Sequence, residues 1–246
     1  LETRNSKLET RNSKLETRNS TNTGDAVGMN EGKVIDVWHA APMHAGTVFV
    51  VPDGCRDVIV TGNNFGVVDV HVSPLFHTTL AIDIQPHQQF TGYRLQAGTV
   101  LDEDALLAAL VADEHDVEGK IATFSSSNGN LTEALSCMSQ RLGSVASIAA
   151  ELGVSERTLQ RHVQQHSGKS PLFWLRLARI RQSALALVTG NSLDNTPRLS
   201  VCDIAFEFGF SDQAHFCREI KHWFGVTPEQ LKTRQDLIDQ LYQAGY

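Results

Sequence analysis

The chain has 246 residues, of which 41% are apolar and 20% are charged, and its formal net charge is −7. This composition is ordinary for globular domains, and the length is enough for two of them. No apolar run is long enough to span a bilayer and no signal peptide opens the chain, so we expect a cytoplasmic protein without a membrane segment. The four cysteines lack C-x-x-C spacing, which disfavours both a zinc site and a disulfide framework.

Charge is divided unevenly along the chain. Residues 30–130 hold 4 Lys and Arg against 13 Asp and Glu, whereas residues 131–246 hold 12 against 11. The net charge is therefore −9 in the first region and +1 in the second. Within the second region, residues 155–181 carry six basic side chains and one acid, Glu156. Because acidic surfaces repel phosphate, we expect any contact with nucleic acid to lie in the second region.

The N-terminal stretch is a tandem of LETRNSK, LETRNSK and LETRNS, followed by TNTGDAVG. Such a repeat is typical of an appended tag. We therefore expect residues 1–28 to be a tag and linker, non-native or disordered, with Met29 as a plausible native start, and we leave them out of the fold prediction.

Residues 29–125 are predicted to form a β-sandwich that ends in a helix. Six short segments rich in Val, Ile, Thr and aromatic residues are separated by turn signals such as Pro52-Asp53-Gly54. Evenly spaced short strands favour a sandwich or a small barrel. The apolar spacing in 101–115 then predicts a helix. The predicted strands are 33–39, 47–51, 57–61, 65–72, 78–84 and 90–96.

A Ser/Asn/Gly-rich stretch at 123–130 predicts a domain boundary, and residues 131–246 are predicted to be all-α. The fold class is therefore α+β. A helix is expected over 131–142; with the helix at 101–115 it is a candidate dimer surface, although apolar helix stripes are more often core.

The region from Ser144 to Arg234 contains a near-repeat. Gly153 recurs as Gly209 at an offset of 56, and Gly168 recurs as Gly225 at an offset of 57, so the second copy has one extra residue. A repeat of this size indicates one supersecondary unit used twice.

Each copy predicts a helix-turn-helix unit. Apolar residues at i, i+3, i+4 and i+7 form one stripe of a short helix, which ends at Gly153 or Gly209. A serine, Ser155 or Ser211, then follows at the position where we expect it to cap a second helix. The two units are predicted at about 145–166 and 201–223.

The exposed face of the second helix differs between the copies. In the first copy this face carries only Arg and Gln, which pair with guanine and adenine at base edges in the major groove. In the second copy Ala214 and Cys217 leave fewer hydrogen-bonding groups, so we predict a base-reading first copy and an anchoring second copy. The alternative is that both faces are ordinary solvated surfaces. The candidate DNA-binding residues are Arg157, Gln160, Arg161, Gln164, Gln213, Ala214, His215, Arg218 and Lys221.

Between the copies, Ser170-Pro171 predicts the start of a helix that continues to about Gly190. Its length of about 28 Å would hold the two second helices close to one turn of B-DNA, about 34 Å, apart. Arg176, Arg179 and Arg181 on this helix are expected to pair with acids or to touch phosphate, and for at least one of them we expect packing within the chain.

Residues 144–234 resemble the DNA-binding domain of the AraC/XylS family of bacterial transcription regulators. The resemblance lies in IAAELGVSERTLQRHV (148–163), SPLFWLRLARI (170–180) and DIAFEFGFSDQAHFCREIKHWFGVTP (203–228). It implies two helix-turn-helix motifs joined by a long helix, which contact adjacent major-groove segments of a double-stranded promoter. Cys217 departs from the family pattern, in which serine is frequent there, and this leaves open how many direct contacts the second motif makes.

The front domain resembles a sandwich-like, cupin-like sensor class of the same family, in PDGCRDVIV (52–60) and GYRLQAGT (92–99). The resemblance implies a small-molecule effector or a homodimer surface, RNA polymerase as a partner, and activation more often than repression. It gives no effector-binding residues. A regulator controlled by a partner protein or by its own abundance, without a ligand, is the open alternative.

Two enzymatic alternatives are disfavoured. A metal-dependent cupin would need a His-x-His pair, and none occurs here, so we expect no metal, no cofactor and no catalytic residue. A methyl-accepting cysteine at Cys55 would need cationic or metal neighbours to activate its thiolate, and no other cysteine clusters near it in the sequence.

Overall fold

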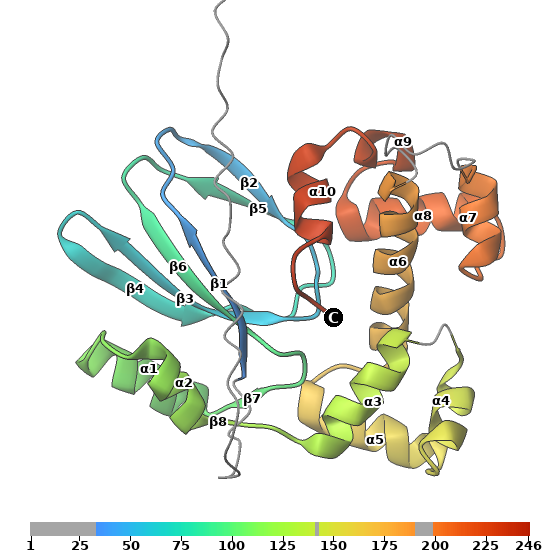
Figure 1. The fold of residues 1–246 in the computed structure, drawn as a ribbon, viewed down its shortest axis with the longest axis horizontal. Coiled ribbons are helices and arrows are strands. Elements are labelled where there is room, and N and C mark those ends of the chain that lie inside the picture. The colour runs from blue at the N-terminus through green and yellow to red at the C-terminus, as the bar shows by residue number, and fades with distance from the viewer. Residues whose placement is uncertain (1–32, 141–142, 190–198) are drawn as a thin grey trace, which may run out of the picture. The chain divides into compact units, whose positions relative to one another are not determined.

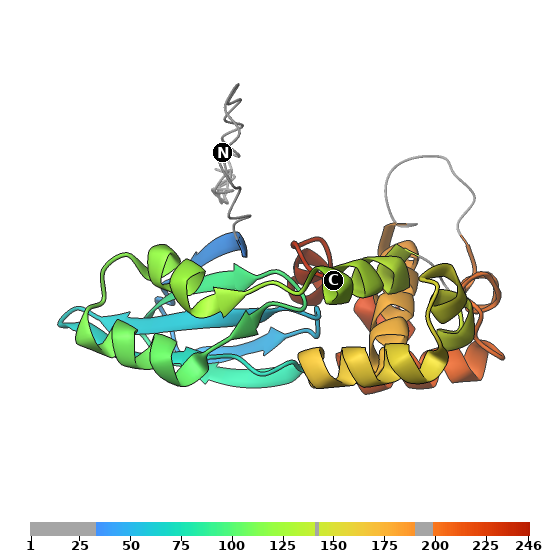
Figure 2. The same cartoon turned by 90° about the horizontal axis from the view of Figure 1, so that it is seen from below.

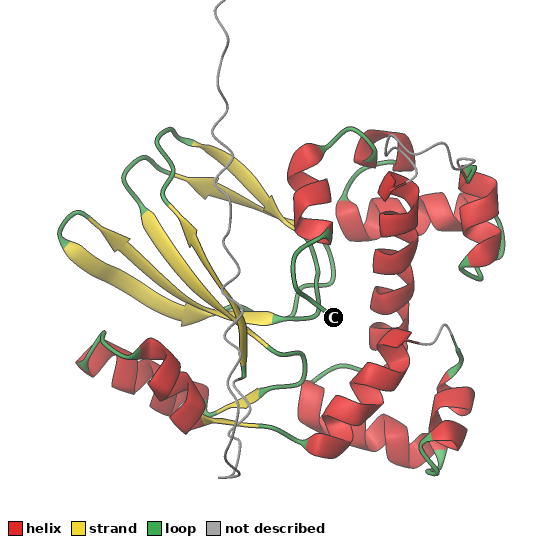
Figure 3. Cartoon of the chain, viewed as in Figure 1, coloured by secondary structure: helices red, strands yellow, loops and turns green. Residues whose placement is uncertain are grey.

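A computed structural model describes residues 33–140, 143–189 and 199–246, so the predicted tag at 1–28 lies outside the described residues. Residues 33–126 contain all the described strands and two helices, and we call them the β-part (Figure 3). The described residues of 129–246 form helices and no strand, and we call this range the helical part. The predicted α+β class is confirmed. None of the described helices is long and apolar enough to cross a membrane.

The six predicted strands are present, and each bound lies within two residues of the predicted one. Two further strands, each of two residues, pair with one another. The strands are β1 (Val34–Ala40), β2 (Gly46–Val50), β3 (Arg56–Asn63), β4 (Gly66–Val72), β5 (Leu80–Ile84), β6 (Gln89–Leu95), β7 (Val100–Leu101) and β8 (Ser125–Ser126).

The described strands form separate antiparallel sheets. One has four strands in the order β1-β6-β3-β4, and a second pairs β2 with β5 (Figure 1). In the larger sheet the central strand β3 places Val58 opposite both Tyr93 of β6 and Val72 of β4. The cupin-like sandwich expected from the sequence stays a prediction.

Helices α1 (Glu103–Ala112) and α2 (Val117–Phe124) pack on the four-stranded sheet, where Leu106, Leu110 and Ile121 contact the apolar side chains of β3 and β6 (Figures 1 and 2). Helix α1 is shorter than the helix predicted over 101–115. The second helix was not predicted. The end of α2, strand β8 and the start of α3 together cover most of the expected break at 123–130. Only two residues, 127 and 128, separate β8 from the helical part.

Helix α6 is the centre of the helical part, and Figure 1 shows it running between the other helices. It packs against α3, α5, α7, α8, α9 and α10. Because α6 has neighbours on several sides, its side chains are buried nearly all round, and Trp174, Leu177 and Ile180 are 0–1% exposed. The helices are α3 (Gly129–Gln140), α4 (Val145–Glu151), α5 (Glu156–Ser167), α6 (Pro171–Thr189), α7 (Val201–Glu207), α8 (Gln213–Phe224), α9 (Pro228–Leu231) and α10 (Gln235–Leu241).

The apolar stripes of the two candidate dimer helices are mostly core. Leu131, Leu135 and Met138 of α3 are fully or almost fully buried in the core of the helical part, and Leu106 and Leu110 of α1 are buried against the sheet. This agrees with the interpretation of these stripes as core, not as a dimer surface.

Gln240 of α10 binds the main chain next to β2. Its Oε1 accepts a hydrogen bond from the Val51 amide at 3.0 Å, and its Nε2 donates to the Phe49 carbonyl oxygen at 2.6 Å. One side-chain amide therefore satisfies a donor and an acceptor of the same chain segment, as a neighbouring strand would do.

A buried polar cluster joins the segment after β2 to the helical part. Arg94 forms ion pairs with Asp53 at 3.1 Å and Asp57 at 3.2 Å, and Arg181 of α6 donates to the Pro52 carbonyl oxygen at 3.2 Å. Burial raises the pKa of Asp53, and the Arg94 guanidinium offsets part of that rise. Buried charges are retained only where such partners compensate their lost hydration.

Candidate nucleic-acid interface

Both predicted helix-turn-helix units are present, as α4–α5 and α7–α8. The first helix of each begins with a capping box, Ser144 with Ser147 and Ser200 with Asp203. The turn between the helices contains a glycine in the left-handed region, with φ of 67° at Gly153 and 69° at Gly209 in the second unit. Glycine is required there because a Cβ atom makes this conformation unfavourable.

The cap of the second reading helix was predicted wrongly. Ser155 does cap α5, since its side chain accepts from the Thr158 amide at 3.1 Å. In the second unit Asp212, not Ser211, caps α8, and it accepts from the His215 amide at 2.6 Å. Ser211 is the extra residue of the second copy and lies in the turn.

From the caps onward the two reading helices therefore correspond at an offset of 57. Each residue on the α5 face therefore has a positional counterpart on α8: Arg157 corresponds to Ala214, Gln160 to Cys217, Arg161 to Arg218, and Gln164 to Lys221.

The α5 face is exposed, while Leu159 and Val163 on its other side are buried. Arg157, Gln160 and Arg161 make no hydrogen bond or ion pair with any residue that the structure describes. Their donors and acceptors are thus available to a ligand. Gln164 differs, because its Nε2 donates to the Gly168 carbonyl oxygen at 3.0 Å and closes the end of the helix.

The α8 face offers fewer available groups. Gln213, Ala214, Arg218 and Lys221 are exposed. His215 is half-buried, and its Nδ1 lies 3.1 Å from the Ser211 hydroxyl while its ring packs edge-on against Phe210. The structure therefore holds His215 within the turn. That these residues contact DNA stays a prediction.

The three connector arginines all make contacts within the chain. Arg176 pairs with Glu219 of α8 at 2.9 Å. The Arg179 guanidinium lies 5.1 Å from the centre of the Phe210 ring and donates to the Gly209 carbonyl oxygen at 3.4 Å. Arg181 is buried in the polar cluster described above. Among the basic residues of 155–181, Arg157 and Arg161 are the two that make no ion pair, hydrogen bond or contact with an aromatic ring in the described structure, since Arg181 donates to carbonyl oxygens and Lys169 lies over the Phe173 ring.

Two histidines lie together near the end of α5. The rings of His162 and His166 are 4.6 Å apart, and the His162 Nε2 atom is buried without a hydrogen-bond partner in the described structure. Burial lowers the pKa of His162, and the nearby His166 and Arg161 lower it further.

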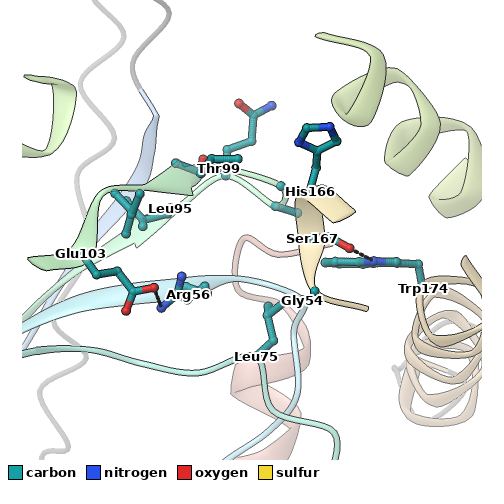
Figure 4. A pocket seen from close by; sticks show the side chains of 15 residues that line it. Gly54, Arg56, Leu75, Leu95, Thr99, Glu103, His166, Ser167 and Trp174 are labelled. Atoms are coloured by element: carbon teal, nitrogen blue, oxygen red, sulfur yellow. Dashed lines mark hydrogen bonds and ion pairs between the residues drawn. The ribbon is translucent and has the colours of Figure 1, made fainter. Parts of the chain in front are cut away.

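A cavity of about 280 Å³ lies between the C-terminal end of α5 and the β-part (Figure 4). Its apolar lining includes Leu75, Leu95 and Trp174. Its polar lining includes Arg56 and Glu103, which form an ion pair at 2.8 Å. The last turn of α5 contributes further lining residues, His166, Ser167 and the adjacent Gly168. None of these lining residues was predicted from the sequence to bind an effector.

No group of three or more His, Cys, Asp or Glu among the described residues is placed to hold a metal ion. The Cys55 thiol is buried, and burial, together with the nearby Asp53 carboxylate, raises its pKa to about 12. The side chain is therefore a neutral thiol at physiological pH, the opposite of an activated nucleophile.

Comparison with known sequences identifies the helical part. Residues 148–234 match the family model of a helix-turn-helix domain. The chain is 34% identical over 89 residues to the transcriptional activator RhaS of Escherichia fergusonii, covering 36% of this chain and 30% of that protein. It is 29% identical over 140 residues to a probable thc operon regulatory protein of Rhodococcus erythropolis, covering 55% of this chain and 41% of that protein. The matches thus span between about a third and two fifths of these relatives.

Solved structures were also compared. An AraC-type transcriptional regulator from Chromobacterium violaceum is 28% identical, covering 47% of this chain and 95% of that chain, with a TM-score of 0.37. ToxT from Vibrio cholerae O395 is 12% identical, covering 85% of this chain and 97% of that chain, with a TM-score of 0.38. Scores at this level support no conclusion about function.

The two capped units on one connecting helix, together with the family match, define the helical part as a helix-turn-helix DNA-binding domain. The relatives are transcription regulators. The resemblance of this region to the DNA-binding domain of AraC-type regulators, found in the sequence, is confirmed for residues 148–234.

Proposed function

We propose that the chain is a sequence-specific transcriptional activator in which α5 and α8 bind adjacent major-groove segments of promoter DNA. The observation that carries this proposal is the exposed α5 face, where Arg157, Gln160 and Arg161 have no partner within the described residues. Activation is favoured because the RhaS relatives are named activators. The proposal includes action in the bacterial cytoplasm with RNA polymerase as a partner.

The two reading helices are unequal in this proposal. Helix α5 presents Arg and Gln side chains that can hydrogen-bond base edges. Helix α8 presents Ala214 and Cys217 at the corresponding positions, and His215 is held by its own turn. Arg218 and Lys221 of α8 are better suited to phosphate, which fixes register without reading sequence.

The test uses the full chain and a pool of randomised DNA duplexes. Repeated selection followed by footprinting should give two protected segments on one face of the duplex, about one helical turn apart. Replacing Gln160 with Ala should relax sequence preference in one segment, whereas Lys221→Ala should weaken binding to all duplexes. Selection of no preferred sequence would contradict the proposal.

The β-part is proposed to be a cupin-like sensor domain whose effector occupies the 280 Å³ cavity. The support is the position of the cavity, because its lining includes the last turn of α5 and an occupant would touch a reading helix directly. The mixed lining, apolar with one ion pair, fits a small molecule with an apolar body and a polar end.

A thermal-shift screen tests the sensor role. A ligand that binds the folded state at a hundredfold excess over its Kd stabilises it by about 2.7 kcal/mol. A metabolite that raises the Tm of the wild-type protein should fail to do so for Leu75→Trp, which fills the cavity. An equal shift in both would place the ligand elsewhere. No shift with any metabolite would favour the alternative, a regulator controlled by a partner protein or by abundance.

A homodimer is the remaining part of the proposal. Val67 and Val68 of β4 and Val111 of α1 are exposed and line one cavity of about 510 Å³ on the β-part. Light scattering at increasing protein concentration tests it, with Val111→Glu as the variant that should shift the protein toward monomer.

A further inference from the structure

The beginning of α6 contacts both reading helices. Trp174 Nε1 donates a hydrogen bond to Ser167 Oγ, at the last residue of α5, at 3.0 Å. Two residues further along α6, Arg176 Nη2 donates to both carboxylate oxygens of Glu219 in the middle of α8, at 2.9 and 3.1 Å. One turn of the connecting helix is therefore bonded to α5 and to α8.

Aromatic rings fill the space between these two bonds. The Phe173 ring lies 5.4 Å from the Trp174 ring and 5.8 Å from the Trp223 ring of α8. Trp223 Nε1 also donates to Glu219 Oε2 at 3.3 Å, so the carboxylate is held from two sides. We call these residues the α6 bridge: Ser167, Phe173, Trp174, Arg176, Glu219 and Trp223.

The groups of the α6 bridge allow little movement. Trp174 and Trp223 are 0% and 2% exposed, and the Glu219 side chain is 15% exposed. The Arg176 side chain is 38% exposed and reaches both Glu219 oxygens through one nitrogen, Nη2, while the Phe173 and Trp223 rings pack beside this ion pair. The ion pair and the ring packing together limit how far α8 can turn relative to α6. The bridge therefore holds α8 at one angle to α6, and α6 at one position against the end of α5.

We propose that the α6 bridge selects the spacing between the two DNA segments that the protein binds, with Arg176 and Glu219 as positioning residues. The inference rests on the proposed function, in which α5 and α8 both enter the major groove. One additional base pair moves the second segment by about 3.4 Å and rotates it by about 35°. Hydrogen bonds between the guanidinium and the carboxylate tolerate only a few tenths of an ångström. An intact bridge therefore admits one spacing.

The experiment measures spacing preference with the full chain. The probe is the duplex that the wild-type protein selects from a randomised pool, together with two versions in which one base pair is inserted or removed between the protected segments. The wild-type protein should prefer its own spacing by about tenfold or more, because a misplaced helix loses its contacts. Glu219→Gln and Arg176→Met should each reduce that preference to about threefold or less.

A charge-swapped variant and a control separate positioning from simple stability. The double variant Arg176→Glu with Glu219→Arg should recover part of the spacing preference, which a mere loss of packing would not allow. Lys232→Ala removes an exposed ion pair with Glu229 in the same helical part and should leave the preference unchanged. Melting curves confirm folding; if Arg176→Met is unfolded, Glu219→Gln carries the test.

Three outcomes contradict the inference, and they are distinguishable. If Glu219→Gln binds all three duplexes more weakly but keeps the tenfold preference, the bridge only stabilises the domain. If the wild-type protein binds all three spacings equally, α5 and α8 are not held at a fixed separation on DNA. If the wild-type protein selects no duplex at all, the proposed function itself fails.

Discussion

Arg161→Ala is the substitution that most directly tests base reading by α5. Arg161 is exposed and has no partner among the described residues, so its removal should change the free energy of unfolding by no more than about 0.5 kcal/mol. A bidentate contact between arginine and guanine contributes about 1–3 kcal/mol to discrimination. Affinity for the selected duplex should therefore fall by about five- to 150-fold with the Tm unchanged.

The assay must separate a base contact from a phosphate contact. Affinities are measured on the selected duplex and on its single-base-pair variants at several salt concentrations. A base contact predicts that Arg161→Ala stops distinguishing the bases at one position and keeps the wild-type salt dependence. A phosphate contact predicts uniform weakening and a salt slope smaller by about one.

The control for Arg161→Ala is Lys120→Ala. It removes one positive charge from the β-part, where Lys120 pairs with Asp113, and should leave DNA binding unchanged. If Arg161→Ala binds the selected duplex with wild-type affinity and specificity, the assignment of α5 as the main base reader is refuted.

Three further substitutions test the local structure of the helical part. Asp212→Ala should lower the free energy of unfolding by about 1 kcal/mol through loss of the α8 cap, whereas Ser211→Ala should change it little; equal effects in denaturant titrations would restore Ser211 as the cap. Gly209→Ala should cost about 1–2 kcal/mol because φ is 69° there, although a Cβ would meet no atom within 4 Å; an unchanged denaturation midpoint would argue against the left-handed turn. His162 has a lowered pKa in the folded state, so the unfolded state binds its proton more tightly and stability should fall as pH drops below about 6.5. His162→Gln should flatten that dependence in thermal melts, and a profile identical to the wild type would exclude His162 as its source.

The helix-turn-helix units were predictable because their signals are local. Apolar spacing, a turn glycine and a polar cap all fall within about twenty residues, and Gly153 and Gly209 ended their helices as expected. The error at Ser211 arose because both Ser211 and Asp212 are good caps. The offset of 57 between Gly168 and Gly225 could have identified the correct cap. If the two reading helices have equal length, the residue that corresponds to Ser155 at this offset is Asp212.

Helices α2, α9 and α10 were not predicted, and the local signals of α2 and α10 are weak. Helix α2 has eight residues, and its cap Asp116 adopts a left-handed conformation with φ of 49°. Helix α10 has no side-chain cap at Arg234, and it is stabilised by Leu237 and Leu241 in the core. Packing against distant segments decides such short elements, and a pattern within seven or eight residues does not contain that information.

The partners of the connector arginines could not be predicted either, because they also lie in distant segments of the chain. The sequence could place Arg176, Arg179 and Arg181 on one helix, but not choose between acids and phosphate for them. Their partners lie 43, 30 and 129 residues away along the chain. The lining of the 280 Å³ cavity is drawn from still more distant parts of the chain, namely residues 54, 56, 75, 95–101, 103, 166–168 and 174.

The amide of Gln240 has a consequence for how the protein behaves at high concentration. The edge of a two-stranded ribbon offers unpaired N–H and C=O groups, which can template the addition of a strand from another molecule. At β2, the Val51 amide and the Phe49 carbonyl oxygen are already bonded to Gln240. An incoming strand would have to displace a side chain that the folded chain itself supplies. We therefore expect Gln240 to hinder strand addition at this end of β2, an effect on solubility that is separate from any contact with DNA or an effector.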